Sequence, residues 1–461
     1  MTPSWDLIVV GGGAAGLGAA RAGAAAGARV LLVADGELGG ECTFTGCVPS
    51  KALIEAAARA ANFRAAMAAV RRSVAAIAAT ETAEVLAAEG IDVLRGRAVF
   101  TGPGEISANG QVLRAAAYVI ATGTRPATPP LPGLEEVPFL TNETIFSLDE
   151  LPPRLAILGG GPVGCELAQA FARLGSQVTL IEAAARLLPA ADPEASQVLA
   201  AVLQADGIIV RTGVAAARID ARGKGVAVVL ATGEPVDADR LLVATGRRPA
   251  TGRLGLDAAG IRRDDRAYIR TSRHLATTAA GVYAAGDVTG RMQFTHAAFA
   301  MGRLAARNAL RRPWSIPGSF AAEAIPWVVF TDPEVAQVGL TEAQAAAARA
   351  DARVANVPMS ELDRAVTAGR TEGFVKIIAG RRRILGNAGG GRVLGATVVA
   401  PRAGEMIHEP ALAMRAGMFT GRLAQATHAY PTWSLAIQQA AAQFFGRLGG
   451  RTARPARRAP D

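Results

Sequence analysis

Two cysteines separated by four residues, Cys42 and Cys47, lie in the segment Gly39–Lys51. The chain has one further cysteine, Cys165, and a structural disulfide framework would use more, so the pair favours redox chemistry over a structural cross-link. On a regular helix this spacing separates residues by about 7.5 Å along the axis, whereas a disulfide needs Cα atoms within about 7 Å. We therefore expect a backbone break between the cysteines, where Gly46 permits one.

Two segments repeat one glycine pattern between an apolar strand and a helix. The first loop carries Gly11, Gly13 and Gly16, and the second carries Gly159, Gly161 and Gly164. Such glycines let the backbone approach a pyrophosphate at a helix N-terminus, where free N–H groups and the helix dipole favour negative charge. One match alone is weak evidence, but two matches in the same strand–loop–helix setting predict two dinucleotide sites.

An acidic residue near the end of the following strand takes the ribose hydroxyls in such sites. After the first loop the candidate is Asp35, for which the alternative is an ordinary surface turn residue. After the second loop the candidate is Glu182, which would accept hydrogen bonds from a 2′-OH and repel a 2′-phosphate. NADH is therefore favoured over NADPH, although Arg186 lies near enough in the sequence to keep NADPH as the alternative.

Length and composition indicate a protein of several domains. The chain has 461 residues, of which 50% are hydrophobic, so it can bury more than one core. We find no apolar run long enough to cross a membrane, and the start of the chain lacks the basic flank and cleavage site of a signal peptide. We therefore expect a cytoplasmic, reducing location, where a cysteine pair is more often catalytic than structural.

The net charge of +10 comes almost wholly from arginine that is scattered along the chain. This distribution is not the clustered basic face of a nucleic-acid-binding protein, so we expect no nucleic-acid partner. Basic residues are concentrated near the end, and we expect residues 449–461 to form a basic, disordered tail. The spacing of histidine, cysteine and acidic residues predicts no metal site.

The set of motifs resembles that of the class I pyridine nucleotide-disulfide oxidoreductases, which include dihydrolipoamide dehydrogenase, glutathione reductase and mercuric reductase. The resemblance runs from residue 6 to about residue 446. Besides the cysteine segment and both glycine loops, it rests on Ala121–Gly123, Ala244–Pro249 and Tyr283–Val288. It implies an α/β fold with two Rossmann-like dinucleotide-binding domains, each a three-layer ββα unit, and a C-terminal α+β dimerisation domain.

The resemblance also implies the order of the domains. The first part of an FAD-binding domain is expected at 1–149, an NAD(P)-binding domain at 150–274, and a central FAD-binding part at 275–320. A dimerisation domain is expected at 321–448, before the tail. A homodimer follows, because in this family a C-terminal segment completes the partner's site.

The family roles are carried over residue by residue. Asp287 is expected to bind the ribityl chain of FAD, and Gly286 to let the backbone approach it. Lys51 matches a lysine beside flavin N5 that pairs with a glutamate, here Glu166, and an ammonium there would stabilise reduced, anionic flavin. The further cofactor contacts that the resemblance implies are Gly40, Ala121, Thr122, Gly123 and Gly246.

The implied cycle has two halves. NAD(P)H delivers a hydride to FAD, and the reduced flavin then opens the disulfide through Cys47. Cys42 becomes the thiol that faces the acceptor. Because the thiolate is the nucleophile, its formation must be favoured by a nearby positive charge or base.

The family pattern breaks near the C-terminus. Disulfide-reducing members carry an acid/base histidine followed by a glutamate, but here Tyr430 stands at the place of the histidine and Leu435 at that of the glutamate. A tyrosine, with a pKa near ~10, is a poor base at neutral pH. Three interpretations stay open: His428 substitutes for the base, Tyr430 donates a proton, or the acceptor needs no base.

The leading hypothesis is an FAD-dependent NAD(P)H:disulfide oxidoreductase that resembles dihydrolipoamide dehydrogenase. One alternative is a metal-ion reductase like mercuric reductase, or a quinone reductase, although the tail lacks the vicinal cysteines that relay Hg²⁺ in mercuric reductases. Another alternative is a non-enzymatic, redox-sensing flavoprotein. The intact cysteine pair and the two nucleotide loops favour an enzyme over a sensor.

Overall fold

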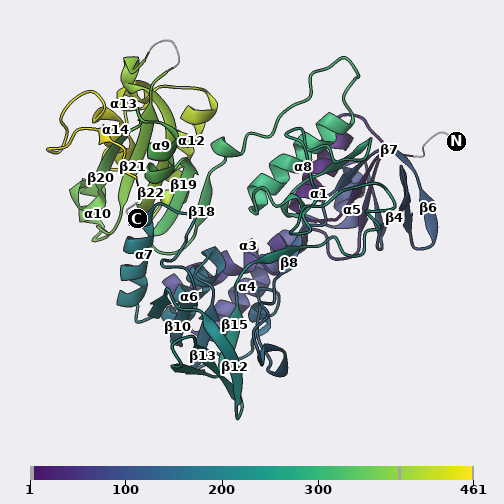
Figure 1. The fold of residues 1–461 in the computed structure, drawn as a ribbon, viewed down its shortest axis with the longest axis horizontal. Helices are drawn as coiled ribbons and strands as arrows, with labels where there is room; N and C mark the ends of the chain where they lie inside the picture. Colours follow the sequence, from purple (N-terminus) through teal and green to yellow (C-terminus); the bar gives the residue numbers. More distant parts are fainter. Residues whose placement is uncertain (1–4, 383–385, 459–461) are drawn as a thin grey trace. The chain divides into compact units, whose positions relative to one another are not determined.

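The computed structural model of the chain describes residues 5–382 and 386–458. The chain forms two compact units, each built from separate segments. The first unit comprises Met1–Pro129, Leu140–Glu150 and Thr245–Ala322, and the second comprises Pro130–Phe139, Leu151–Ala244 and Glu323–Asp461. Figure 1 shows the elements with their labels.

The first unit is built on a parallel sheet in the order β17-β7-β1-β2-β3. Its strands are β1 (Trp5–Val10), β2 (Val30–Ala34), β3 (Ile91–Arg95), β7 (Ala115–Ile120) and β17 (Val282–Ala284). The central strands β1 and β2 are almost continuous apolar runs, as expected where helices or loops cover both faces of a parallel sheet.

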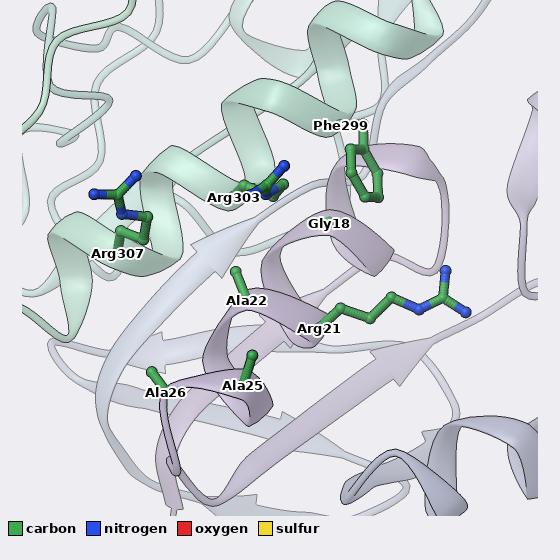
Figure 2. Close-up of a pocket in the computed structure, with 8 residues that line it drawn as sticks. All are labelled: Gly18, Arg21, Ala22, Ala25, Ala26, Phe299, Arg303 and Arg307. Atoms are coloured by element: carbon green, nitrogen blue, oxygen red, sulfur yellow. The ribbon is translucent and has the colours of Figure 1, made fainter.

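Two helices of the first unit, α1 (Ala14–Ala25) and α8 (Thr295–Ala309), lie side by side (Figure 1). Glycine makes this contact possible, because a Cβ on Gly302 would lie 2.0 Å from the carbonyl oxygen of Ala15. Beside the contact is a cavity of about 430 Å³, lined by Arg303 and Arg307 of α8 and by small residues of α1 (Figure 2). None of the three cysteines lines it.

The segment between β2 and β7 is helical and then forms strands. Its helices are α2 (Gly40–Phe44), α3 (Cys47–Ala58), α4 (Phe63–Ala78) and α5 (Ala83–Ala88). After β3 comes an antiparallel sheet of β4 (Val99–Gly102), β5 (Glu105–Ala108) and β6 (Gln111–Leu113). Side chains of Asn62 and Thr82 cap α4 and α5.

The chain returns to the first unit at Thr245. One contact that holds it there is a strand pair, because β16 (Arg247–Pro249) is antiparallel to β8 (Thr124–Pro126). The hydroxyl of Thr122 also donates a hydrogen bond of 3.1 Å to the carbonyl of Ala250. The expected boundary of a nucleotide-binding domain at residue 274 stays a prediction.

The second unit contains the other dinucleotide-type sheet, in the order β11-β10-β9-β15. Its strands are β9 (Arg154–Leu158), β10 (Gln177–Glu182), β11 (Ile209–Thr212) and β15 (Arg240–Val243), with helices α6 (Pro162–Arg173) and α7 (Pro193–Ala205). An antiparallel sheet of β12 (Ala216–Arg222), β13 (Gly225–Leu230) and β14 (Pro235–Ala238) is inserted before β15. Both helices begin with proline at the first helical position, where its missing N–H costs nothing.

The C-terminal part of the second unit is a six-stranded antiparallel sheet in the order β18-β19-β22-β21-β20-β23. Its strands are β18 (Trp327–Val329), β19 (Glu334–Gly339), β20 (Arg353–Pro358), β21 (Phe374–Gly380), β22 (Arg392–Ala400) and β23 (Arg454–Pro455). Its helices are α9 (Glu342–Ala348), α10 (Asp363–Thr367), α11 (Ala403–Met406), α12 (His408–Arg415), α13 (Thr420–Gln425) and α14 (Leu435–Ala442). Short 3₁₀ helices cover Leu134–Glu136, Ile145–Ser147, Asp287–Thr289, Ala322–Ala324, Met359–Glu361 and Ala388–Gly390.

The described part of the predicted disordered tail is ordered. Strand β23 pairs with β20, and the guanidinium of Arg454 donates hydrogen bonds to the carboxylate of Glu342. An edge strand offers unpaired backbone groups, so even two residues find partners there. The prediction of disorder is thus corrected for residues 449–458, and the remaining tail residues lie outside the described ranges.

Candidate functional site

The two glycine loops have almost the same geometry. Gly11 and Gly159 have φ angles of +112° and +108°, which L side chains rarely adopt. A Cβ on Gly16 would lie 1.8 Å from the carbonyl oxygen of Gly11, and a Cβ on Gly164 would lie 1.8 Å from that of Gly159. The third glycine of each loop therefore lets the helix pack directly against the loop.

Each loop leaves open space where a ligand would lie. A Cβ on Gly13 or on Gly161 would meet no atom within 4 Å. These residues are the N-caps of α1 and α6, and neither helix has a side-chain hydrogen bond at its cap. The first N–H groups of both helices thus have no side-chain acceptor at the cap, an arrangement that fits the pyrophosphate of a dinucleotide.

The carboxylate of Glu182 lies at the end of β10, beside the second loop. Its two oxygens accept hydrogen bonds from the backbone N–H groups of Gly160, at 2.6 Å, and Ala184, at 2.7 Å. The matching place in the first repeat is occupied by Ala34. The N–H of Gly11 donates to the carbonyl of Val33, as the N–H of Gly159 donates to that of Ile181, and Ala34 and Glu182 are the residues that follow these two carbonyls. The candidate Asp35 follows one residue later and pairs with Arg97 at 3.0 Å.

The guanidinium of Arg186 is turned to its own chain. It donates hydrogen bonds to the carbonyl oxygens of Leu188, Pro189 and Ala191 and to the hydroxyl of Ser196. These bonds engage the Nη1 and Nη2 atoms, so a 2′-phosphate would share this guanidinium with its own chain.

The backbone between the cysteines is broken as the sequence predicts. Helix α2 ends at Phe44 and α3 begins at Cys47, and a Cβ on Gly46 would lie 2.9 Å from the carbonyl oxygen of Glu41. A side-chain hydrogen bond between Cys42 and Cys47 is the largest cause that raises the pKa of Cys42. Burial and the negative charge of Glu81 raise it further.

A hydroxyl that the sequence analysis missed contacts Cys47. The Oγ1 atom of Thr295 lies 3.1 Å from the Sγ atom, and Thr295 is the first residue of α8. A hydroxyl at a helix N-terminus favours a thiolate, because both the O–H group and the helix dipole are directed at the charge. The only signal in the sequence was the start of a helical pattern shortly after the Asp287 motif.

A polar network joins the cysteine segment to Asp287. The guanidinium of Arg247 contacts the carboxylate of Glu41, next to Cys42, and donates to the hydroxyl of Thr124 at 2.6 Å. That hydroxyl donates to Asp287 at 3.1 Å, and Arg247 lies 3.7 Å from the same carboxylate. Burial raises the pKa of Asp287, and the charge of Arg247 opposes this effect.

The other expected cofactor contacts lie on loops with conformations that favour glycine. Gly123, Gly246 and Gly286 have φ angles of +67°, +139° and +78°. Ala121 continues from β7, and its N–H donates to the carbonyl of Val10 at 2.8 Å. Gly40, with a φ of +62°, approaches the first loop, since a Cβ there would lie 2.9 Å from the α-carbon of Gly13.

Lys51 and Glu166 lie in different units, so their expected pairing stays a prediction. Lys51 is in α3 of the first unit. Glu166 is a buried residue of α6, 4% exposed, and one of its oxygens accepts a hydrogen bond of 2.8 Å from the N–H of Phe330.

The C-terminal candidates have partners within their own chain. The hydroxyl of Tyr430 is in an exposed side chain and donates to Asp363 at 2.8 Å, an interaction that raises the pKa of the tyrosine. The Nε2 atom of His428 lies 3.0 Å from Glu409, and its Nδ1 atom lies 3.0 Å from the carbonyl of Ala426. Both ring nitrogens of His428 therefore face oxygen atoms of its own chain.

Within the described ranges, no group of three or more histidine, cysteine or acidic residues is arranged to hold a metal ion. Over the same residues, we find no helix with the length and apolarity needed to cross a membrane. Cys165 is fully buried, and its thiol donates to the carbonyl of Gly160 at 3.3 Å.

Two family profiles together match nearly the whole chain. The profile described as "Pyridine nucleotide-disulphide oxidoreductase" matches residues 5–302. The profile described as "Pyridine nucleotide-disulphide oxidoreductase, dimerisation domain" matches residues 325–441.

Curated relatives and solved structures match over the same extent. A dihydrolipoyl dehydrogenase of Thermus scotoductus is 37% identical over 461 aligned residues, which cover 95% of this chain and 97% of the relative. A mercuric reductase of Streptomyces lividans is 36% identical and is covered to 96%, with 95% of this chain. The Cu(II) complex of the HOCl-induced flavoprotein disulfide reductase RclA from Escherichia coli is 30% identical with a TM-score of 0.87, over 96% of this chain and 99% of that one.

Proposed function

Because the chain belongs to the pyridine nucleotide-disulphide oxidoreductase family, we propose that it carries two electrons from NADH through FAD and the Cys42–Cys47 pair to an acceptor that needs no histidine base. Family membership confirms the predicted fold with its C-terminal dimerisation domain. It also confirms the predicted class, an NAD(P)H-dependent flavoprotein disulfide oxidoreductase that uses FAD, in place of the non-enzymatic alternative. The dimerisation domain supports a homodimer.

The first glycine loop is the proposed cradle of FAD. Bound there, FAD supplies a carrier that accepts a hydride and passes on two electrons. The N-terminus of α1 would hold its pyrophosphate, and the partly buried carboxylate of Asp287 would accept hydrogen bonds from its ribityl chain. Arg247 would keep the charge of Asp287 compensated.

Within the cysteine pair, we assign Cys47 to the flavin side and Cys42 to the acceptor side. The hydroxyl of Thr295 lies 3.1 Å from the sulfur of Cys47 and would donate a hydrogen bond to a thiolate there. The broken backbone at Gly46 removes the regular helical spacing that would keep the two sulfurs apart.

The second glycine loop is the proposed cradle of NADH. Glu182, which is held beside this loop by the N–H of Gly160, would accept a hydrogen bond from a ribose 2′-OH, and its negative charge would disfavour a 2′-phosphate. Arg186, the one nearby cation that the sequence offered to such a phosphate, is held by its own carbonyl groups.

One observation carries the proposed choice of acceptor: the residue at the place of the family's acid/base histidine is an exposed tyrosine bound to Asp363. A thiol–disulfide exchange with lipoamide needs a base for the entering or leaving thiol, whereas reduction of a quinone or of a thiophilic metal ion by a dithiol does not. We therefore propose a quinone or metal-ion acceptor over lipoamide.

Steady-state oxidation of NADH and NADPH against lipoamide, glutathione disulfide, Hg²⁺ and quinones tests the proposal. We expect NADH to be the better reductant and the quinones or Hg²⁺ to be reduced faster than either disulfide. Cys47→Ser should abolish the long-wavelength absorption band of the two-electron-reduced enzyme. Lipoamide turnover as fast as that of the best other acceptor would refute the proposed acceptor class.

A further inference from the structure

A carboxylate that the proposed cycle does not use lies beside the cysteine segment. Glu81 is in the turn between α4 and α5, and its Oε2 atom accepts a hydrogen bond of 2.8 Å from the hydroxyl of Thr43. Thr43 is 2% exposed and directly follows Cys42. The contact joins residues 38 positions apart, so the packing of α4 against the cysteine segment, and not the local sequence, brings the carboxylate here.

The surrounding backbone is shaped around this carboxylate. Gly39 has a φ of +95°, and a Cβ there would lie 2.1 Å from the Oε2 atom of Glu81 and 2.6 Å from the hydroxyl oxygen of Thr43. Only glycine leaves room for the pair. The next residue, Thr82, caps α5 by accepting a hydrogen bond from Val85, which fixes the turn that carries Glu81.

The titratable and polar groups around Cys42 come from α2, α3, α8 and β16, besides the turn that carries Glu81. Cys47 lies on α3 and the hydroxyl of Thr295 on α8. Glu41 lies on α2, as Cys42 does, and is paired with Arg247 of β16. Glu81 raises the pKa of the Cys42 thiol, after the larger effects of the hydrogen bond with Cys47 and of burial, whereas the hydroxyl of Thr295 lowers it. Among the described residues, Glu81 has no arginine, lysine or histidine as an ion-pair partner, so no salt bridge neutralises its charge.

We propose that Glu81 is a positioning residue that keeps the proton of the reduced pair on Cys42. Two electrons and one proton convert the disulfide into one thiol and one thiolate. A negative charge beside Cys42 disfavours a thiolate on that sulfur, so the proton stays on Cys42 and the charge resides on Cys47, where Thr295 donates a hydrogen bond to it.

This inference rests on the proposed function, since it concerns the reduced cysteine pair. Glu81 would act from the same chain on the proton of the acceptor-side thiol, for which relatives of the class use a histidine of the partner subunit. Here Tyr430 stands at that place and is bound to Asp363. Control of the proton by Glu81 would therefore be independent of dimer formation.

The test is a pH series of alkylation rates at each cysteine, measured by peptide mass spectrometry on the full-length protein with its bound cofactor. Dithiothreitol first reduces the pair, giving up two electrons and two protons to become its cyclic disulfide, and is then removed without air. The substitution Glu81→Gln keeps the hydrogen bond from Thr43 but removes the charge. We expect alkylation of Cys42 below its midpoint to become roughly three- to tenfold faster, with a rise in the Cys42:Cys47 labelling ratio.

Two further variants separate charge from structure. Glu84→Gln is the matched control, because Glu84 lies three residues later in an exposed position with its hydrogen bond to Thr82, and its profile should equal that of the unchanged protein. Glu81→Asp keeps the charge and should keep Cys42 slow. Faster labelling of both cysteines in parallel would indicate simple loosening of the segment and would overturn the inference.

An unchanged Cys42 profile in Glu81→Gln would also overturn it. The proposed function has a separate readout: reduction of the pair in the unchanged protein by NADH, followed by counting of thiols. If NADH does not produce the two thiols, the proposed function fails whatever the alkylation profiles show. If NADH produces them and the profiles coincide, only the role of Glu81 fails.

Discussion

At the scale of single residues, the contact between Thr295 and Cys47 allows a direct test of what stabilises the thiolate at Cys47. Thr295→Val removes the hydroxyl at nearly constant volume, so the thiolate at Cys47 loses a donor at 3.1 Å. A hydrogen bond to a charged group contributes about 1.5–3 kcal/mol, so we expect the thiolate to form roughly tenfold less readily at a given pH. The long-wavelength band of the reduced enzyme should then appear at higher pH, as followed by a pH titration.

Thr295→Ser is the matched control, because it restores the hydroxyl on the same backbone. It should return the titration close to that of the unchanged enzyme. A titration that is the same for the valine and serine variants would show that the hydroxyl does not act on the sulfur, and that the helix N-terminus alone provides the stabilisation.

The same scale shows what the sequence could and could not predict. The break at Gly46 was predictable, because the rise of a helix and the Cα separation that a disulfide allows are general properties. With these values, the spacing of the two cysteines alone indicates a break. The contact of Thr295 with Cys47 spans 248 positions and that of Arg247 with Glu41 spans 206, so neither leaves a local pattern. Position-specific contacts of this kind depend on how the elements pack.

At the scale of elements, the two strand–loop–helix repeats are separate sites with one geometry. Gly16→Ala and Gly164→Ala would each place a Cβ 1.8 Å from a carbonyl oxygen of the loop, which forces the helix away from its cradle. Overpacking of this kind costs about 1–3 kcal/mol. We expect Gly16→Ala to reduce the FAD content, as measured by visible absorbance per chain, and Gly164→Ala to keep FAD but raise the KM for NADH at least severalfold.

Gly102→Ala serves as the control, because a Cβ at Gly102 meets no atom within 4 Å and its φ is not positive. Loss of FAD in Gly164→Ala with retention in Gly16→Ala would reverse the assignment of the two loops.

The elements also explain one difference from the sequence prediction. The apolar strands and glycine turns were visible as patterns, and the structure contains them. Strand β23, by contrast, has only Arg454 and Pro455, a composition that predicts no strand by itself. It forms because β20 presents a free edge and Glu342 accepts the guanidinium, which are both properties of the folded domain.

At the scale of the whole molecule, a buried ion cluster joins the dinucleotide-type half of the second unit to its C-terminal sheet. Lys376 of β21 is 1% exposed and lies 3.0 Å from Asp192, 3.2 Å from Glu194 and 3.1 Å from Glu342. Asp192 and Glu194 belong to the start of α7. A buried cation with three carboxylates is stable only while all members keep their partners, because an unpaired buried charge is costly.

The cluster makes the stability of this unit depend on pH in a definite direction. Burial alone would raise the pKa of Glu342, but the hydrogen bond from Arg454 and the charge of Lys376 outweigh it and lower the pKa from 4.5 to about 2. A lowered carboxyl pKa contributes stability above pH 4.5 that is lost as the pH falls towards 2. Glu342→Gln should therefore lower the thermal midpoint by several degrees at neutral pH and by little near pH 2.

The matched control is Glu361→Gln, which removes an ion pair between Glu361 and Arg451. Both of these side chains are about 40% exposed, so this variant should change the midpoint by less at every pH. A loss in Glu342→Gln that is equal at neutral and acidic pH would show that the carboxylate acts by packing and not by its charge.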